Sequence, residues 1–450
     1  MSGFNQPNLK LISVGMIFGL ATVFLKGTVV MLGVIAITGI ILWNFLPKPD
    51  KKFLVTLFIA GVSLRIILFA TIYIVSVLQG GNGELVPDSR LYFLKTLGMI
   101  KLWEGQPQFS EQVDAGAGNN GYIIILAFFY KLIGFDSVII NPISIFSDKL
   151  INCLIGTISG IPIFYIAKDI FGRNVAKIAS FLVMFYPSLV LWSMTNNREM
   201  SNIFLVCLIL LCLLRSFKGR RAFNFIAIFI SLLCLATIRG YILFCMIGVI
   251  SISYLFFILY KSKNKFRIVL SIVIACLIFL NFTGYGKKIK SNFLDLNNFA
   301  LSVQATNTAV LSQGGSTYRI YDDDLVSGGK VNKAKLINGF LKGWFYFMLV
   351  PFPWAVSSKL QILSYPQAII WYFLLFSAII GIIIAVRYRF KLSFVILSYI
   401  FIVTSGFALS EGNVGSTLRH RDLITPFYFI FASVGLMHLF KPGGLFEEEQ

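Results

Sequence analysis

The sequence predicts an all-α, polytopic integral membrane protein. Hydrophobic residues make up 57% of its 450 residues and charged residues only 13%, and its mean hydropathy is +0.82. A soluble protein of this length needs about twice that share of charged residues. Apolar runs recur along the chain, and many approach the roughly 20 residues that a membrane-spanning helix needs. These observations predict a bundle of transmembrane helices.

The net charge of +20 comes from basic residues that gather in short loops between the apolar runs. This is the pattern of cytoplasmic loops beside an anionic leaflet, so nucleic acid is not a predicted partner. The six cysteines stand singly in apolar runs, without metal-ligand spacing, and are predicted to be small core residues. The first apolar run lacks a small-residue cleavage site, so we expect it to be a span.

The basic loops also orient the spans, because Lys and Arg stay on the cytoplasmic side. Five such loops separate the predicted spans: 48–52, 168–177, 215–221, 261–267 and 387–391. Placing all of them inside gives about twelve spans with both termini in the cytoplasm. The chain then divides into an extra N-terminal transmembrane hairpin at 1–47, a catalytic transmembrane domain at 48–440 and a cytoplasmic tail at 441–450.

Two long segments, 79–148 and 284–366, are predicted to be external. Each contains an apolar patch, at 122–135 and at 340–354, that is short of a full span. We therefore expect interfacial helices there. Arg65, inside the predicted span that ends near residue 78, is expected to face protein or to extend its charge to the interface.

The acidic residues test this orientation, because the positive-inside rule says little about Asp and Glu. Almost every acid falls on the external side; the exceptions are Asp50, Asp169 and the tail at 447–449. Four polar features converge on the same side: Asp88, Asn197-Arg198-Glu199, Arg239 and Arg419-His420-Arg421-Asp422. Ionised groups at outer span ends must find a partner or water, so we expect a functional site on this face.

Asp88 lies at the start of the first external segment. Pro87 disfavours helix at Val86, and Asp88 is predicted to be the N-cap of a helix that continues to Ile100. The helix macrodipole favours an anionic carboxylate at this position. Such a carboxylate can act as a general base toward a hydroxyl or as a metal ligand. The alternative is a capping residue without a catalytic role.

The external arginines lie on the wrong side for a topology signal. Guanidinium groups suit phosphate and pyrophosphate, so Arg239, Arg419 and Arg421 are predicted to bind an anionic ligand. Between two arginines the neutral form of His420 is favoured, which leaves it able to take a proton. Glu199 either belongs to a tight polar turn or lines the mouth of a cavity.

Two further features have a structural explanation beside a functional one. Asp322-Asp323-Asp324 is interpreted as a solvated loop, with metal binding as the less favoured alternative. Trp103, Tyr122 and Trp344 can stack on sugar faces or anchor the chain at the membrane interface.

Taken in order, the motifs resemble those of a known family. The stretches that carry the resemblance are Asp88-Ser89-Arg90-Leu91-Tyr92 with Gly105, Gly121-Tyr122 followed by 128–134, Asn152 with Gly156, Tyr165-Ile166-Ala167 followed by Phe171-Gly172-Arg173, Tyr186-Pro187-Ser188, Glu199, Arg239, and Arg419-His420-Arg421 with Pro426. Together they resemble the polyprenyl-phosphate-dependent membrane glycosyltransferases of the GT-C fold, and the nearest branch looks like the bacterial protein-mannosyltransferase and aminoarabinose-transferase-like group. The resemblance covers roughly residues 53–440. Ser89 stands where the family often has a second acid.

The resemblance implies inverting transfer of a sugar from a polyprenyl-phosphate or polyprenyl-diphosphate donor. The acceptor would be a hydroxyl of a glycan, lipid or protein outside a bacterial plasma membrane, in cell-envelope synthesis. The expected catalytic residues are Asp88, Glu199 and His420. The expected donor-phosphate ligands are Arg239, Arg419 and Arg421, and the expected acceptor or sugar contacts are Arg90, Tyr92, Trp103 and Tyr122. If a metal supports Asp88, the cofactor would be a divalent cation, Mg²⁺ or Mn²⁺.

Two other functions fit some of these features. A surface-polysaccharide polymerase or ligase also uses external arginines and a large external loop, with His420 as the base in place of Asp88. A transporter of an anionic solute would need charges near span centres and broken helices at paired positions of an internal repeat. The charges lie at outer span ends and we find no convincing repeat, which favours the transferase.

Overall fold

The structure is a computed structural model in which the chain divides into two compact units. Unit 1 comprises Met1–Phe164, Ser180–Ile209 and Ala227–Gly240, and unit 2 comprises Tyr165–Ala179, Leu210–Ile226 and Tyr241–Gln450. The structure describes residues 26–81, 84, 86–110, 113, 120–132, 142–219, 221–262, 295–312, 316–322, 324–327, 330–352, 354 and 364–440.

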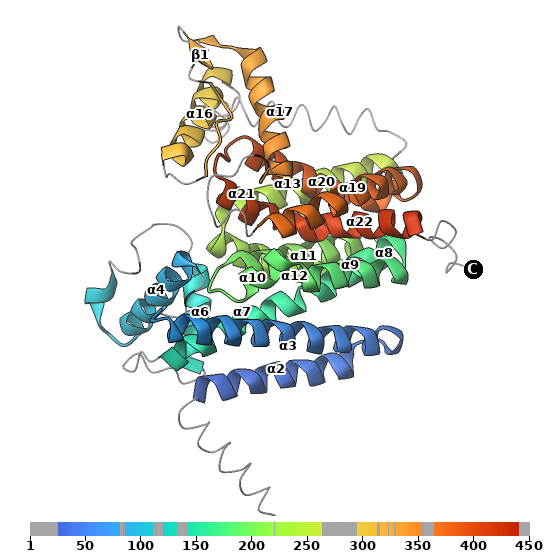
Figure 1. The fold of residues 1–450 in the computed structure, drawn as a ribbon. Helices are drawn as coiled ribbons and strands as arrows, with labels where there is room; N and C mark the ends of the chain where they lie inside the picture. Colours follow the sequence, from blue (N-terminus) through green and yellow to red (C-terminus); the bar gives the residue numbers. More distant parts are fainter. Residues whose placement is uncertain are drawn as a thin grey trace, which may run out of the picture. The chain divides into compact units, whose positions relative to one another are not determined.

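Helices dominate the described residues (Figure 1). From the N-terminus to the middle of the chain they are α2 (Lys26–Phe45), α3 (Lys48–Leu78), α4 (Pro87–Trp103), the short 3₁₀ helix η1 (Pro107–Phe109), α6 (Gly121–Leu132), α7 (Pro142–Ile158), α8 (Gly160–Phe171), α9 (Arg173–Phe185), α10 (Pro187–Ser193), α11 (Glu199–Ser216), α12 (Arg221–Ile238) and α13 (Gly240–Lys261). The later ones are α16 (Leu296–Ser312), α17 (Lys333–Leu349), α19 (Tyr365–Tyr388), α20 (Phe390–Ala408), α21 (Val414–Arg421) and α22 (Thr425–Phe440). A two-stranded antiparallel hairpin, β1 (Val326–Ser327) with β2 (Lys330–Val331), adds a small amount of strand, so the protein is otherwise all-α as predicted.

Six helical segments among the described residues are long and apolar enough to cross a membrane. They are α3, the run Lys149–Phe171 through α7 and α8, α11, α13, α19 and α20. Two bent pairs, α9 with α10 and α21 with α22, raise the number to eight if each pair is one span. These helices indicate a multi-pass membrane protein.

The prediction of about twelve spans exceeds this number. By the same criteria α2 and α12 contain only shorter apolar helices, Val30–Phe45 and Ala222–Ile238. The first half of the predicted N-terminal hairpin and the predicted span at 268–282 lie outside the described residues. The count of twelve therefore stays a prediction.

Two local features differ from the sequence prediction. The basic stretch at 48–52 is not a loop but the first turn of α3, since Pro49 lies in the first helical turn, where a missing N–H is tolerated. The predicted span that includes Tyr186-Pro187 bends by 55° between α9 and α10. Tyr186 is extended, as expected for a residue before proline, and this ends α9.

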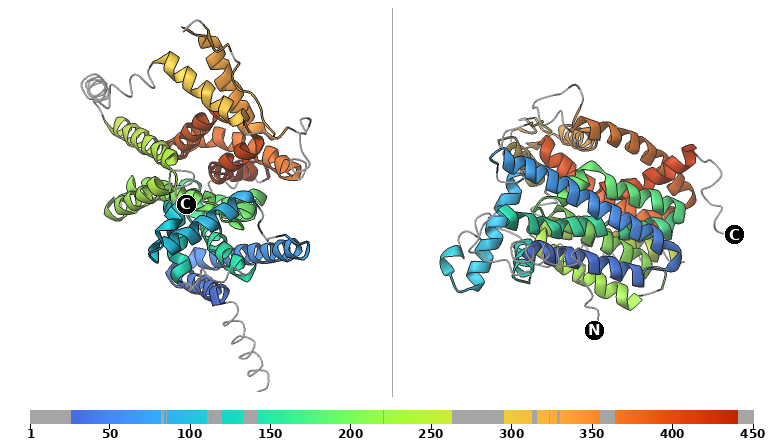
Figure 2. Two further views of the ribbon diagram at one scale, coloured as in Figure 1. Left: turned by 90° about the vertical axis from the view of Figure 1, so that its left-hand side faces the viewer. Right: turned by 60° about the horizontal axis from the view of Figure 1, so that its bottom comes forward.

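In unit 1, α2 packs against α3 and α7, and α3 packs against α7. The two blue helices α2 and α3 run alongside each other in Figure 1 and in the second view of Figure 2. Arg65 of α3 faces protein, as one of the two predicted alternatives: its Nε donates to Ser193 Oγ at 2.8 Å and its Nη1 to the Gly61 carbonyl at 3.0 Å. The charge thereby ties α3 to the end of α10.

The helices of the first predicted external segment share a core with α2, α7 and α12. α4 packs against α6, and the buried residues of this core include Phe93, Leu97, Tyr122 and Tyr130. A Cβ on Gly121, the first residue of α6, would lie 2.2 Å from Thr237 Oγ1, so only glycine lets α6 begin this close to α12. This contact places Tyr122 in the core.

Both short apolar patches of the predicted external segments overlap a helix. Residues 122–132 of the first patch lie in α6, of 12 residues, and 133–135 lie outside the described residues; the patch at 340–354 overlaps α17, of 17 residues. Neither helix is among the candidate spans. Their lengths agree with the prediction of interfacial helices, which stays a prediction.

In unit 2, α19 and α22 lie side by side and meet backbone to backbone (Figure 1). A Cβ on Gly435 would lie 1.9 Å from the Ser377 carbonyl oxygen, and one on Gly381 would lie 1.8 Å from the Phe431 carbonyl oxygen. Small residues allow such close approach of helices in membrane proteins. The two glycines therefore set the distance between α19 and α22.

We expect Gly435→Ala to destabilise unit 2, because the added methyl group meets backbone rather than a side chain that can move. Overpacking of this kind costs about 1–3 kcal/mol. Gly406→Ala in α20 is the matched control, since a Cβ there meets nothing within 4 Å and alanine favours helix by about 0.5–1 kcal/mol. The thermal unfolding temperature of the purified protein measures both changes. Equal unfolding temperatures for the parent and Gly435→Ala would contradict the close contact.

The predicted orientation can be tested with single cysteines in a cysteine-free background. Exposed positions suit the test: Glu104, Ser302 and Gly415 are predicted to be external, and Lys218 and Arg387 cytoplasmic. On intact cells, a membrane-impermeant thiol reagent should label the first three cysteines and leave the last two unmodified until the cells are broken. Labelling of Cys at 104 together with protection of Cys at 415 would contradict a shared external face.

Candidate functional site

Asp88 lies in the first turn of α4 and not at its N-cap, which corrects the prediction. The N-cap is Val86, with φ −140° and ψ 145°, and Pro87 occupies the first helical turn ahead of Asp88. Proline is favoured at the first helical position because the N–H that it lacks has no partner there, and this moves the cap one residue earlier. Asp88 is half-buried and remains in the positive field of the helix N-terminus.

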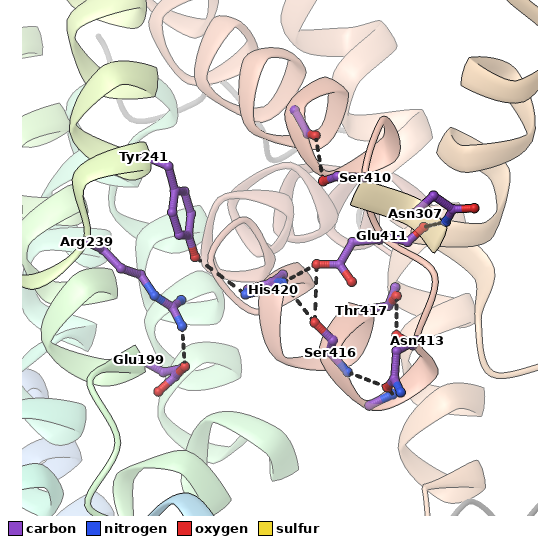
Figure 3. Close-up of polar contacts among 12 residues, drawn as sticks. Glu199, Arg239, Tyr241, Asn307, Ser410, Glu411, Asn413, Ser416, Thr417 and His420 are labelled. Carbon is purple, nitrogen blue, oxygen red and sulfur yellow. Dashed lines mark hydrogen bonds and ion pairs between the residues drawn. The ribbon is translucent and has the colours of Figure 1, made fainter. Parts of the chain in front are cut away.

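Glu199 and Arg239 form a buried ion pair in unit 1. Arg239 Nη2 lies 2.8 Å from Glu199 Oε1, and the two side chains are only 4% and 2% exposed. Figure 3 shows this contact between the first residue of α11 and the residue that follows α12. The sequence predicted both residues as part of one site but gave them separate roles, as catalytic residue and phosphate ligand. The structure brings them into direct contact.

Four charged side chains of unit 1 influence the hydroxyl of Tyr92. Burial raises the pKa of its hydroxyl; Arg198 and Arg239 oppose this rise, and Glu199 and Asp88 add to it. The charges of two acids and two arginines therefore act on the hydroxyl of Tyr92. Its phenol stays neutral at physiological pH and can donate a hydrogen bond. We call these five residues the unit 1 cluster: Asp88, Tyr92, Arg198, Glu199 and Arg239.

A buried amide supports this cluster. Asn152 Nδ2 donates to the Tyr122 hydroxyl at 2.8 Å, to the Asn197 carbonyl at 3.1 Å and to the Thr195 carbonyl. Tyr122 in turn packs edge-on against Tyr92, with ring centroids 5.4 Å apart. Asn152 thus fixes both the tyrosine behind Tyr92 and the loop that leads into α11.

The four predicted sugar-binding residues lie in different environments. Tyr92 belongs to the cluster, whereas Tyr122 is buried behind it and presents no open ring face. Arg90 is exposed on α4. Trp103 lies at the other end of α4, 11 residues from Tyr92, which is about 16 Å along a helix. The structure therefore does not bring Trp103 together with Tyr92, and stacking of Trp103 on a sugar stays a prediction.

A second polar group forms in unit 2 around His420 of α21. Glu411 Oε1 contacts His420 Nδ1, and the Ser416 hydroxyl lies 3.3 Å from both atoms. On the other side of the imidazole, Nε2 lies 3.5 Å from the Tyr241 hydroxyl (Figure 3). We call Tyr241, Glu411, Ser416 and His420 the unit 2 cluster.

Arg421 has a structural task that the sequence did not suggest. It is 2% exposed, and its Nη1 donates to the carbonyls of Met348 at 3.0 Å and Val350 at 2.7 Å. Its guanidinium also lies 4.7 Å from the ring of Trp371. The predicted role of Arg421 as a phosphate ligand stays untested, but these contacts already explain its burial. Arg419, two residues earlier, is half-buried.

The predicted metal sites receive no support from a ligand cluster. Within the described part of the chain, no three His, Cys, Asp or Glu side chains gather in a way that could hold a metal ion. Of the acidic triplet, Asp323 lies outside the described residues, and Asp324 contacts Lys335. The hydrogen bond from Lys335 lowers the pKa of Asp324, as expected for a solvated ion pair. Binding of Mg²⁺ or Mn²⁺ stays a prediction.

Sequence reasoning gave no site role to Asn152, which supports the unit 1 cluster, or to Glu411 and Tyr241 of the unit 2 cluster. Asn152 entered only as part of the family resemblance, although a single amide in an apolar run signals a buried hydrogen-bond partner. Glu411 belongs to none of the motifs that predicted a site, although it is one of the few acids near a histidine in the sequence. Tyr241 follows Arg239 closely but is one of 18 tyrosines. No local pattern distinguishes it.

Comparison with known proteins adds no family assignment. Neither a scan of protein-family models nor a search of curated proteins finds a match to this chain. The resemblance to GT-C glycosyltransferases therefore rests on the sequence motifs, and function must be inferred from them and from the two clusters.

We expect Glu199→Gln to destabilise the protein, because it leaves the buried Arg239 guanidinium without its counter-charge. Breaking one side of a buried pair costs about 3–5 kcal/mol. The double variant Glu199→Gln/Arg239→Gln removes both charges and should recover much of the unfolding temperature. A Glu199→Gln protein as stable as the parent would contradict the buried pair. If the double variant folds but loses activity, the pair acts in function as well as in stability.

Proposed function

We propose that the protein is a membrane glycosyltransferase that moves a sugar from a polyprenyl-phosphate or polyprenyl-diphosphate donor to an acceptor hydroxyl. The reaction would take place on the non-cytoplasmic face of a bacterial plasma membrane, in synthesis of an envelope polysaccharide, glycolipid or glycoprotein. The multi-pass membrane character suits a donor whose lipid tail stays in the bilayer. The order of the sequence motifs supports the same reaction class.

The observation that carries this proposal is the surroundings of Tyr92. Two carboxylates and two guanidiniums, from α4, the start of α11 and the end of α12, act on one phenol. A structural ion pair needs only two charges of opposite sign, and Glu199 with Arg239 is such a pair. Asp88 and Arg198 are two further charges that this structural role does not require. A transfer site needs an acid–base group and positive charge close together, and the unit 1 cluster supplies both.

In the proposed step, the acceptor hydroxyl gives its proton to the Asp88 carboxylate while its oxygen bonds to the anomeric carbon of the sugar. The bond from that carbon to the donor phosphate breaks, and the lipid phosphate leaves with the electron pair. Attack opposite to the phosphate inverts the anomeric centre. Asp88 suits the base because it is half-buried, whereas Glu199 is fully buried and already paired with Arg239.

The other members of the unit 1 cluster would position and polarise the reactants. Tyr92 can donate its hydroxyl proton in a hydrogen bond to the acceptor or to the sugar. Arg198 Nη1 donates a hydrogen bond to the Ile238 carbonyl at 3.4 Å. This contact holds the Arg198 guanidinium near the Glu199–Arg239 ion pair. A divalent cation would fit Asp88 as a carboxylate that supplements phosphate oxygens, and there it would neutralise charge on the leaving phosphate.

The test begins with cells that lack the protein. The lipid-linked sugar that it consumes should accumulate and should be identified by mass spectrometry of lipid extracts. We expect Asp88→Asn to lower the rate of transfer by about 10²–10⁴, because it keeps the side-chain shape and removes the base. Glu104→Gln, an exposed carboxylate at the other end of α4, is the matched control and should transfer at the parent rate.

Each alternative gives a different result. Near-normal transfer by Asp88→Asn protein, present at the parent level in the membrane, would remove Asp88 from the proposed role. Accumulation of a lipid-linked oligosaccharide, with loss of long surface chains, would point to a polymerase or ligase. Movement of an anionic solute across vesicles that contain the purified protein, with no lipid-linked sugar accumulating in cells, would point to a transporter.

A further inference from the structure

Four basic residues lie at the end of unit 2 that the sequence predicts to be cytoplasmic. They occupy the end of α13 and the turn from α19 to α20: Lys261, Arg387, Arg389 and Lys391. Neither stretch, 254–262 or 385–394, contains an acidic residue. Four like charges repel one another, so an anion bound among them would lower their free energy. We call these four residues the basic end of unit 2.

Aromatic packing brings the two stretches together. Phe256 of α13 stacks on Phe394 of α20, with ring centroids 4.0 Å apart and 19° between the planes, and it meets Phe390 edge-on at 5.6 Å. Lys391 follows Phe390, and its Nζ lies 4.7 Å from the ring centroid of Tyr260. The start of α20 is thus held against the last turns of α13, so the basic residues lie at the same end of these helices.

Three of the four cations lack an anionic partner. Within the part of the chain that the structure describes, the side chains of Lys261, Arg387 and Lys391 make no ion pair and no hydrogen bond. Lys391 is half-buried, and its ammonium contacts ring faces, that of Tyr260 and that of Phe257 at 5.7 Å. An aromatic ring attracts a cation but is not an oxygen acceptor, so the N–H groups of Lys391 still require one.

The basic residues at the end of α11 differ in this respect. Arg215 Nε lies 3.1 Å from Asp169 Oδ2, and Lys218 Nζ donates to the Asp169 carbonyl at 2.9 Å. Phe217, between them, stacks on Phe257 of α13 with centroids 3.8 Å apart, so these cations lie at the same end of unit 2. They already have a partner within the protein. The basic end of unit 2 is therefore not a general property of every basic loop.

The start of α20 adds backbone donors. This helix of 19 residues begins at Phe390, and no side-chain hydrogen bond caps it at Arg389. The first N–H groups of a helix have no partner inside it and, together with the macrodipole, they attract anions. Lys391 is the second residue of α20. One phosphate group can therefore accept from the backbone N–H groups and from the ammonium at the same time.

We propose that the basic end of unit 2 binds the phosphate of an anionic phospholipid. Tyr260 and Tyr388 beside it are 59% and 57% exposed, and exposed tyrosines are typical of the depth of lipid headgroups. Ile258 and Val386 are exposed apolar residues within one turn of Lys261 and Arg387, so acyl chains would meet an apolar surface next to the charges. A soluble phosphate would leave that surface without a ligand. Basic groups between transmembrane helices are known to hold lipid headgroups in this way.

This site is independent of the proposed transferase reaction. Tyr241 of the unit 2 cluster lies near the other end of α13, 20 residues before Lys261. That is about 30 Å along a helix, which is about the thickness of the hydrocarbon core of a bilayer. The phospholipid would therefore belong to the leaflet opposite to the unit 2 cluster. It would be a bound component of the membrane and not a substrate.

Native mass spectrometry of the purified full-length protein measures its binding of phosphatidylglycerol and of phosphatidylcholine with the same acyl chains. We expect the parent protein to prefer phosphatidylglycerol. Arg387→Gln/Lys391→Gln should weaken binding of phosphatidylglycerol about tenfold or more, because two charge-assisted contacts are lost, and should leave phosphatidylcholine unchanged. Tyr260→Leu, which removes the ring beside Lys391, should weaken it in the same direction. Lys218→Gln is the matched control, since its cation has Asp169 as a partner, and should keep the parent affinity.

Three results would overturn the inference. The first is equal affinity of the parent protein for the two lipids. The second is parent-level affinity for phosphatidylglycerol in an Arg387→Gln/Lys391→Gln protein that unfolds at the parent temperature. The third is displacement of the lipid by millimolar glycerol 3-phosphate, which would indicate a site for soluble phosphates. If the double variant does not fold, Arg387→Gln alone, at an exposed position, gives the same comparison.

Discussion

The buried ion pair between Glu199 and Arg239 is the interaction on which the arrangement of unit 1 depends. Each residue adjoins an apolar helix, and either charge alone would be costly at this depth of burial. Pairing holds the first residue of α11 against the end of α12, and Asn152 holds the loop just before it. Once these two ends are fixed, Arg198 is held beside the Ile238 carbonyl. These contacts hold three of the four charges that act on Tyr92, namely Arg198, Glu199 and Arg239.

The sequence predicted the class of the protein and several individual contacts. Apolar runs of sufficient length predicted the helices. A helix satisfies its own backbone hydrogen bonds and covers them with apolar side chains, as lipid and protein interiors require. The isolated charge of Arg65 was expected to face protein or to reach the interface, and it faces protein. Glu199 and Arg239 were expected to share a site because both fall on the predicted external face. In each case the prediction came from a charged residue that stands in or beside an apolar run.

The predictions that failed depend on competition between neighbouring residues and on the direction in which a helix points each side chain. Asp88 was expected to cap α4, but proline competes for the first helical position and wins it. The three residues Arg419, His420 and Arg421 were treated as one basic run. On a helix, successive side chains point about 100° apart, so Arg421 turns toward α17 and His420 toward Glu411. A linear run of charges says little about which members share a surface.

The backbone contact between α19 and α22 has a consequence for lipids. At Gly381 and Gly435 the helices approach so closely that a single methyl group would collide with the opposite backbone. A hydrocarbon chain is at least as wide as a methyl group, so no acyl or isoprenoid tail can pass between these helices at that level. The seam is closed to lipid. A tail that approaches unit 2 from the bilayer must lie along another of its faces.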